Sequence, residues 1–177
     1  MLITELWVEG LPLPPSANDM YEPTTHKKWK VNRAGQKYLG VRVGRRASDE
    51  LKAFQLKCLS HKNSKLDFFR IIRTQCLEWI KQGYLLRVDT WVAFEHSRLW
   101  TLDGQPKQLD ADNRRKPLQD SLASILNIDD KWFFAGNIEK VTCRSKDLEQ
   151  SVVRIQPHKA RTLDDIKFLR SSNTKGF

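Results

Sequence analysis

The sequence predicts a single α/β domain in which helices pack on a small mixed sheet. The chain has 177 residues, which is the size of one ordinary domain. Hydrophobic residues make up 40% of it, enough to bury a core without disulfides or metals. Segments with the apolar spacing of strands and of helices are interleaved along the chain, and no internal repeat or low-complexity linker separates them.

The first half predicts one strand and two helices. Residues 2–8 are rich in Ile, Leu, Trp and Val, and we expect Gly10 and the prolines after it to end that strand. Ser48 is a good N-cap, followed by two acidic residues, for a helix that ends near residue 60. A second helix is predicted from about residue 66 to residue 82, closed by Gly83. Its expected core positions are Leu66, Phe69, Ile72, Cys76, Trp79 and Ile80.

The second half alternates strands with a helix. Residues 85–94 predict a strand, and residues 97–109 predict a polar loop. Residues 114–126 predict a helix, and we expect further strands at residues 133–143 and 151–156 and a short helix near residues 163–169. The expected apolar face of the helix at 114–126 consists of Leu118, Leu122, Ile125 and Leu126.

The charge predicts a polyanionic partner. The formal net charge is +10 and the pI is about 9.7, which favours nucleic acid over an anionic membrane, since no long apolar run is present. No carboxylate occurs from residue 23 to residue 48, where eight Lys and Arg residues lie with Trp29 and Tyr38. Such a run can be a solvated or disordered arm, but basic residues mixed with aromatics suit phosphate contacts and base stacking.

Several other classes of site are excluded by spacing. The three cysteines and four histidines are scattered, which argues against a zinc site and a disulfide framework. No glycine-rich phosphate loop is present, so no nucleotide cofactor is expected. The N-terminus does not resemble a signal peptide, and we therefore expect a cytoplasmic protein without a membrane partner.

One acidic cluster is a candidate magnesium site. Asp110 and Asp112 stand two residues apart at the start of a predicted helix, and Asp129 and Asp130 follow it. Helical spacing places Asn113, Lys116 and Asp120 on one face, opposite the apolar face. Mg²⁺ prefers such oxygen ligands. Helix caps and an ordinary turn explain the same residues about equally well. A calcium-binding loop does not fit, because the sequence lacks the glycine and the glutamate that such a loop requires.

Two separated segments together resemble the RusA-like Holliday junction resolvases. The first is Pro14-Pro15-Ser16-Ala17-Asn18, close behind the N-terminal strand. The second is Asp110-Ala111-Asp112-Asn113 with Lys116, Asp120 and Leu122, followed by Asp129-Asp130. The order and spacing of these elements match the family pattern over the first twenty residues and about residues 88–156.

The resemblance implies a RusA-like fold over residues 1–158, a homodimer, and Mg²⁺-dependent incision of four-way DNA junctions, with Mn²⁺ able to substitute. It implies that Asp110, Asp112 and Asp130 are the catalytic, metal-binding carboxylates, that Lys116 is the catalytic lysine, and that Asp129 is a further candidate ligand. Residues 45–84 are a predicted helical addition to the family pattern, and residues 159–177 a basic tail.

The function predicted from these residues is a structure-selective endonuclease acting in DNA recombination and repair. The candidate DNA-binding residues are Asn18, Lys27, Lys28, Trp29, Lys30, Arg33, Lys37, Arg114 and Arg115. Two alternatives stay open at this point: a metal-dependent nuclease that acts on other branched nucleic acids, and a protein that binds DNA junctions without cutting them.

Overall fold

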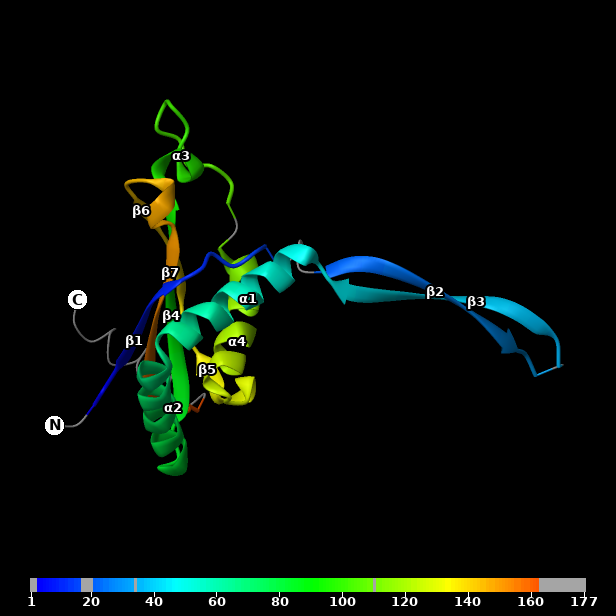
Figure 1. Ribbon diagram of the computed structural model, residues 1–177, viewed down its shortest axis with the longest axis horizontal. Helices are drawn as coiled ribbons and strands as arrows, with labels where there is room; N and C mark the ends of the chain where they lie inside the picture. The colour runs from blue at the N-terminus through cyan, green and yellow to red at the C-terminus, as the bar shows by residue number, and fades with distance from the viewer. Residues whose placement is uncertain (1–2, 17–20, 34, 110, 163–177) are drawn as a thin grey trace, which may run out of the picture.

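The computed structural model describes residues 3–16, 21–33, 35–109 and 111–162. It is a single α/β domain with a mixed five-stranded sheet and packed helices, as predicted. A two-stranded ribbon extends away from the sheet and helices (Figure 1). The strands are β1 (Leu6–Leu11), β2 (Tyr21–Val31), β3 (Lys37–Ala47), β4 (Leu85–Glu95), β5 (Phe133–Ala135), β6 (Ile138–Cys143) and β7 (Gln150–His158); the helices are α1 (Asp49–Ser64), α2 (Leu66–Lys81), α3 (His96–Leu99) and α4 (Asp112–Leu126), with 3₁₀ turns η2 (Asp130–Trp132) and η3 (Lys146–Leu148).

The sheet is built around β4. Its order is β1-β7-β4-β5, and β6 also pairs with β4. β7 runs antiparallel to both β1 and β4, whereas β5 and β6 run parallel to β4. The predicted strand at residues 133–143 is therefore two strands. Gly136 separates them, and it must be glycine because a Cβ there would lie 1.8 Å from the carbonyl oxygen of Val88.

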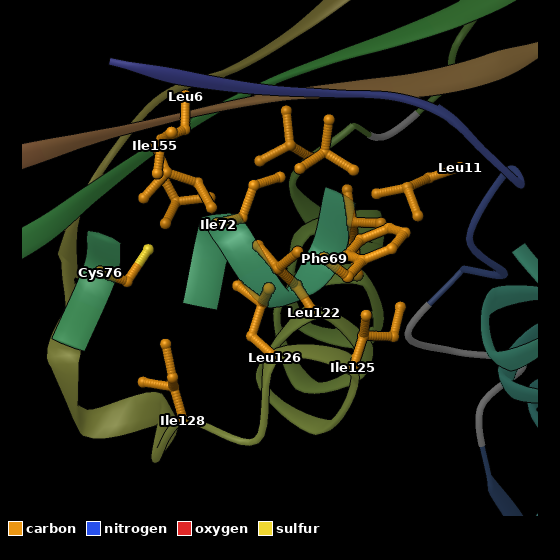
Figure 2. Packing of buried hydrophobic residues seen from close by; sticks show 14 of the residues in the cluster. Leu6, Leu11, Phe69, Ile72, Cys76, Leu122, Ile125, Leu126, Ile128 and Ile155 are labelled. Atoms are coloured by element: carbon orange, nitrogen blue, oxygen red, sulfur yellow. The ribbon is translucent and has the colours of Figure 1, made fainter. Parts of the chain in front are cut away.

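The core lies between one face of the sheet and the helices α1, α2 and α4. Figure 2 shows side chains of α2 and α4 meeting those of β1 and β7, among them Ile72, Leu122, Leu6 and Ile155. The apolar face predicted for α4 is confirmed, since Leu118, Leu122, Ile125 and Leu126 are all buried. The prediction for α2 is wrong at Leu66, which is 59% exposed because it begins the helix outside the core.

The predicted start of α1 and end of α2 agree closely with the structure, whereas α1 ends at Ser64, four residues later than predicted. The Ser48 side chain accepts a hydrogen bond from the backbone N–H of Leu51 at 3.1 Å, so it is the N-cap of α1. Gly83 follows α2 with a φ of +84°, the left-handed conformation that ends many helices. β1, by contrast, begins and ends later than predicted. Gly10, with a φ of +78°, lies inside this strand at an irregularity in its pairing with β7.

The β2–β3 ribbon has no counterpart among the predicted elements. Its eleven antiparallel pairs run from Tyr21↔Ala47 to Val31↔Lys37. A turn joins the strands, in which the backbone N–H of Gly35 donates to the carbonyl of Asn32 at 3.0 Å. The predicted loop at residues 97–109 contains the short helix α3 and one isolated bridge between Trp100 and Pro106. The short helix predicted near residues 163–169 lies outside the described residues. No helix in the described part of the chain is long and apolar enough to cross a membrane.

Candidate active site

One exposed face of α4 carries alternating acidic and basic side chains. The helix begins at Asp112, so Asp112, Lys116 and Asp120 follow one another at intervals of four residues. Residues at that spacing lie above one another on a helix. The opposite face is buried against α1 and α2, and it fixes the helix in place. The sequence prediction that this polar face points away from the core is thus confirmed.

The chain reverses direction after α4 and brings a second carboxylate to this face. Asn127 ends the helix in the left-handed conformation, with a φ of +50°. Ile128 is buried and anchors the turn, and Asp130 then begins η2. This local geometry, rather than any long-range strand pairing, determines where Asp130 lies.

Lys116 lies between two carboxylates from these two elements. Its Nζ donates to Oδ1 of Asp120 at 2.6 Å and to Oδ2 of Asp130 at 3.3 Å. The hydrogen bond that Lys116 donates to Asp120 is the main cause that raises the pKa of Lys116 above its ordinary value, and the bond that it donates to Asp130 adds to it. Lys116 is therefore firmly cationic at neutral pH. Its side chain is nevertheless 62% exposed, so an incoming anion can reach it.

The two neighbouring aspartates of the turn have different partners. Asp129 accepts a hydrogen bond from the backbone N–H of Lys131 at 3.1 Å and pairs with its Nζ at 2.8 Å. These contacts, the side-chain bond first, lower the pKa of Asp129. Asp129 thus caps η2, whereas Asp130 faces Lys116.

An open depression adjoins these carboxylates. It has a volume of about 400 Å³ and is lined by the end of α4 and the turn, from Asp120 through Asn127 to Asp129 and Asp130. Its walls are polar and exposed, which suits a charged group of an extended substrate better than an apolar ligand.

The donor chemistry fits a hard cation, but the site as described is not a complete cage. Asp110 lies outside the described residues, so its place relative to Asp112 and Asp130 is not given. In the remaining chain, no three His, Cys, Asp or Glu side chains are gathered in a metal-binding group. Asp112 and Asp130 are exposed oxygen donors, and Mg²⁺ typically binds through one or two carboxylates together with water and substrate phosphate.

The two motif segments, far apart in the sequence, meet at the start of α4. The guanidinium of Arg114 donates a hydrogen bond to the carbonyl of Pro14, one hundred residues earlier. It also lies over the ring of Phe94 with its Cζ 5.3 Å from the ring centroid. A second depression of about 370 Å³ beside this contact is lined by Pro14, Pro15 and Arg114 among others. These contacts give Arg114 a structural role, and its predicted contact with DNA stays a prediction.

The other predicted DNA-binding residues fall in three places. Lys27, Lys28, Trp29, Lys30 and Lys37 lie on the β2–β3 ribbon, and Arg33 is in its turn. Arg115 is on α4, and Asn18 lies outside the described residues. Trp29 is 67% exposed, so its ring is open to a partner.

An ionic cluster that was not predicted from the sequence lies on the sheet face that the helices leave uncovered. Asp89 is buried in the middle of β4, between Arg87 and Arg154. Burial alone would raise its pKa, but hydrogen bonds from both arginines and from the Asn137 backbone N–H lower it to about 2. Arg154 also lies over the stacked rings of Trp7 and Trp91. The alternation along β4 was the available signal, because it places Arg87 and Asp89 on the face opposite Leu86, Val88 and Val92.

Comparison of the sequence and the structure with known proteins does not assign the chain to a family. No family model matches the sequence, and no curated protein matches it. Solved structures of 2C-methyl-D-erythritol 2,4-cyclodiphosphate synthase align weakly. The enzyme from Plasmodium vivax has a TM-score of 0.28 and 12% identity over 86% of this chain and 91% of that chain. A CDP-bound form of the synthase has a TM-score of 0.26 and 14% identity, over 77% of this chain and 96% of that chain. Likeness at this level carries no argument about fold or function.

Proposed function

We propose that the protein is a Mg²⁺-dependent endonuclease that cuts four-way DNA junctions, with its site on the exposed face of α4 and the turn after it. The observation that carries the proposal is the position of Lys116 between Asp120 and Asp130, beside an open polar depression and one helical turn from Asp112. The resemblance of these residues to the RusA-like resolvases supports the same reading.

In this mechanism the carboxylates of Asp110, Asp112 and Asp130 hold the cation, with Asp129 as a further candidate ligand. A bound Mg²⁺ or Mn²⁺ lowers the pKa of a water and neutralises charge on the attacked phosphate. Lys116 turns from Asp130 to a non-bridging phosphate oxygen, where it stabilises the charge that develops as water adds to phosphorus. The bond to the leaving sugar oxygen breaks as the oxygen of the water bonds to phosphorus. The attacking water gives one proton to solvent, and the leaving oxygen takes up one proton from solvent.

The ionic contacts of Lys116 prepare it for this role. Before substrate arrives, Asp120 and Asp130 keep the lysine protonated and close to the site. Lys116 would lose its contact with Asp130 if that carboxylate held a cation, and it could then reach the phosphate while its contact with Asp120 keeps it beside α4. The ion pair between Lys116 and Asp130 would thus couple the binding of a cation to the binding of phosphate.

The proposal also includes a homodimer, a DNA partner and a cytoplasmic location. A four-way junction has near two-fold symmetry, and a homodimer with two-fold symmetry supplies two identical sites for paired nicks. The net charge of +10 supports a DNA partner, and three unpaired cysteines accord with a cytoplasmic location. Incubation of a labelled junction with the protein, with and without Mg²⁺, tests the proposal. Cutting confined to the branch and dependent on the metal supports it.

A further inference from the structure

The β2–β3 ribbon carries most of the protein's net charge. Residues 21–47 contain eight Lys or Arg residues and one glutamate, a net charge of +7 out of +10 for the whole chain. The ribbon projects from the body, and its close contacts are mainly those between its own two strands (Figure 1). A hairpin that contributes so little to the core and so much charge is a surface for a partner.

The register divides the ribbon into two unlike faces. Successive residues of a strand belong to opposite faces, and directly paired residues share a face. One face, here called the basic face, holds His26, Lys28, Lys30, Arg42 and Arg46, with Glu22, Thr24 and Tyr38. The other, here called the apolar face, holds Trp29, Val31, Leu39, Val41 and Val43, with Tyr21, Pro23, Thr25, Lys27, Lys37, Arg45 and Ala47. The candidate DNA-binding residues of this stretch are therefore shared between two faces, so they do not form one surface.

Glycines stand among the cations of the basic face. Gly40 pairs with Lys28, and Gly44 pairs with Thr24. Glycine has no side chain, whereas valines occupy the intervening positions 41 and 43 of β3 on the apolar face. The basic face is therefore the less apolar of the two faces, which suits a polyanion better.

The dimensions of the ribbon match duplex DNA. Eleven residues of antiparallel strand span about 36 Å, close to the roughly 34 Å length of one turn of B-DNA. The major groove is about 12 Å wide and admits a two-stranded ribbon. The two glycines lie on the basic face alone, whereas the cations are divided between the faces, with four on the basic face and three on the apolar face. What distinguishes the two faces is therefore the aliphatic and aromatic content of the apolar face, not the number of cations.

We propose that the basic face of the β2–β3 ribbon lies along one duplex arm of the DNA and contacts its phosphates, while the apolar face points away from that arm. The inference rests on the proposed function for its choice of DNA as partner, but it is independent of catalysis. It predicts an affinity for unbranched duplex that depends on one face of the ribbon only.

Two triple variants with equal charge changes test this orientation. Lys28→Ala, Lys30→Ala and Arg42→Ala remove three cations from the basic face; Lys27→Ala, Lys37→Ala and Arg45→Ala remove three from the apolar face. The Kd for an unbranched duplex of about 30 base pairs is measured over a salt series. The basic-face triple should flatten the slope of log K against log salt by up to about 2.7, because each phosphate contact contributes about 0.9. The apolar-face triple should change the slope by less than about 0.9, the contribution of one phosphate contact.

Controls separate loss of contact from loss of folding. Exchanging the same basic-face residues for the other cation, Lys28→Arg, Lys30→Arg and Arg42→Lys, should retain the wild-type slope. Equal losses in both triples would overturn the inference, since the ribbon would then act only through its total charge. Tighter binding to phosphatidylserine vesicles than to DNA, with the same face dependence, would also overturn it.

The outcomes for orientation and for catalysis are separable. If the wild-type protein cuts junctions with Mg²⁺ but both triples lose affinity equally, the orientation is wrong and the proposed function stands. If only the basic-face triple loses affinity but no substrate is cut, the orientation stands and the nuclease proposal fails.

Discussion

The Nζ of Lys116 on α4 lies 3.3 Å from Oδ2 of Asp130, which belongs to the turn after the same helix. The carboxylate of Asp129, one residue earlier, instead pairs with Lys131. The two adjacent aspartates therefore have different lysine partners: Asp130 pairs with Lys116, whereas Asp129 pairs with Lys131 and caps η2. This difference leads directly to the first two predictions.

Asp130→Asn should reduce nicking of a four-way junction by roughly 100-fold or more, because it removes a negatively charged ligand from the metal site. Asp112→Asn should do the same. Junction affinity should stay the same or increase in both variants, since a charge that repels phosphate is lost. Asp129→Asn is the matched comparison: asparagine can still cap η2, and because Asp129 pairs with Lys131 and not with Lys116, nicking should fall less than in the other two variants. Nicking rates and Kd values for the three variants check this. Normal cutting by both Asp112→Asn and Asp130→Asn would remove these carboxylates from the mechanism.

Lys116→Ala should lower the single-turnover cutting rate by roughly 10²–10³-fold with little change in junction affinity, because its proposed contact forms mainly in the transition state. The same variant should bind Mg²⁺ more tightly in the absence of DNA, since Asp120 and Asp130 lose the cation that now neutralises them. Lys131→Ala, which removes an equally charged side chain from Asp129, is the control. Stopped-time assays and calorimetric titration with Mg²⁺ give the two values. Weaker DNA binding at an unchanged rate would make Lys116 a phosphate clamp only.

Asp89 should make the stability of the fold depend on acid pH. Its pKa is about 2 in the folded protein against an ordinary 3.8, so the ionised form favours folding above about pH 4. That contribution, about 2 kcal/mol, is lost as the pH falls toward the folded pKa. Asp89→Asn should remove this dependence, and Asp67→Asn, at an exposed position on α2, should not. Urea unfolding between pH 5 and pH 2 measures it. An identical pH dependence in wild type and Asp89→Asn would contradict the assignment.

Trp29→Ala should reduce the preference for a junction over a plain duplex and leave the salt slope nearly unchanged. Trp29 is exposed near the tip of the ribbon and lies on the apolar face, away from the arm that the basic face is proposed to contact. There it can stack on bases left unpaired at the crossover, which is worth roughly 1–3 kcal/mol per base. Val31→Ala on the same face is a control for lost apolar area. The prediction is tested by measuring the ratio of junction affinity to duplex affinity for each variant. An unchanged ratio for Trp29→Ala would show that the ring does not touch bases.

Local patterns in the sequence were enough to predict the elements that build the core. Ser48 and Gly83 mark helix ends through their own backbone and capping chemistry, and the apolar spacing of α4 is that of any amphipathic helix. Helical periodicity predicts that Lys116 lies close to Asp120. The short distance along the chain predicts that Lys116 also lies close to Asp130.

Other features could not be predicted because they depend on partners that are distant in sequence. The contact between Arg114 and Pro14 and the cluster around Asp89 require the packed sheet. The β2–β3 ribbon was overlooked for a different reason. Its charge and aromatic residues indicate a nucleic-acid-binding segment but assign it no secondary structure. The alternation of Lys27, Trp29 and Val31 with Lys28 and Lys30 is the period of a strand, and Asn32 and Gly35 mark its turn. Those period-two and turn signals were present in the sequence.

Metal-dependent cutting at a DNA branch separates a junction nuclease from a protein that only binds junctions. It is measured by incubating the protein with a four-way junction labelled on each strand in turn, and with its linear arms, with and without Mg²⁺. Paired nicks are expected at symmetric positions near the crossover, only with Mg²⁺ or Mn²⁺, with no cutting of the linear arms. Tight junction binding without any nick, or equal cutting of junction and linear arms, would contradict the proposed function.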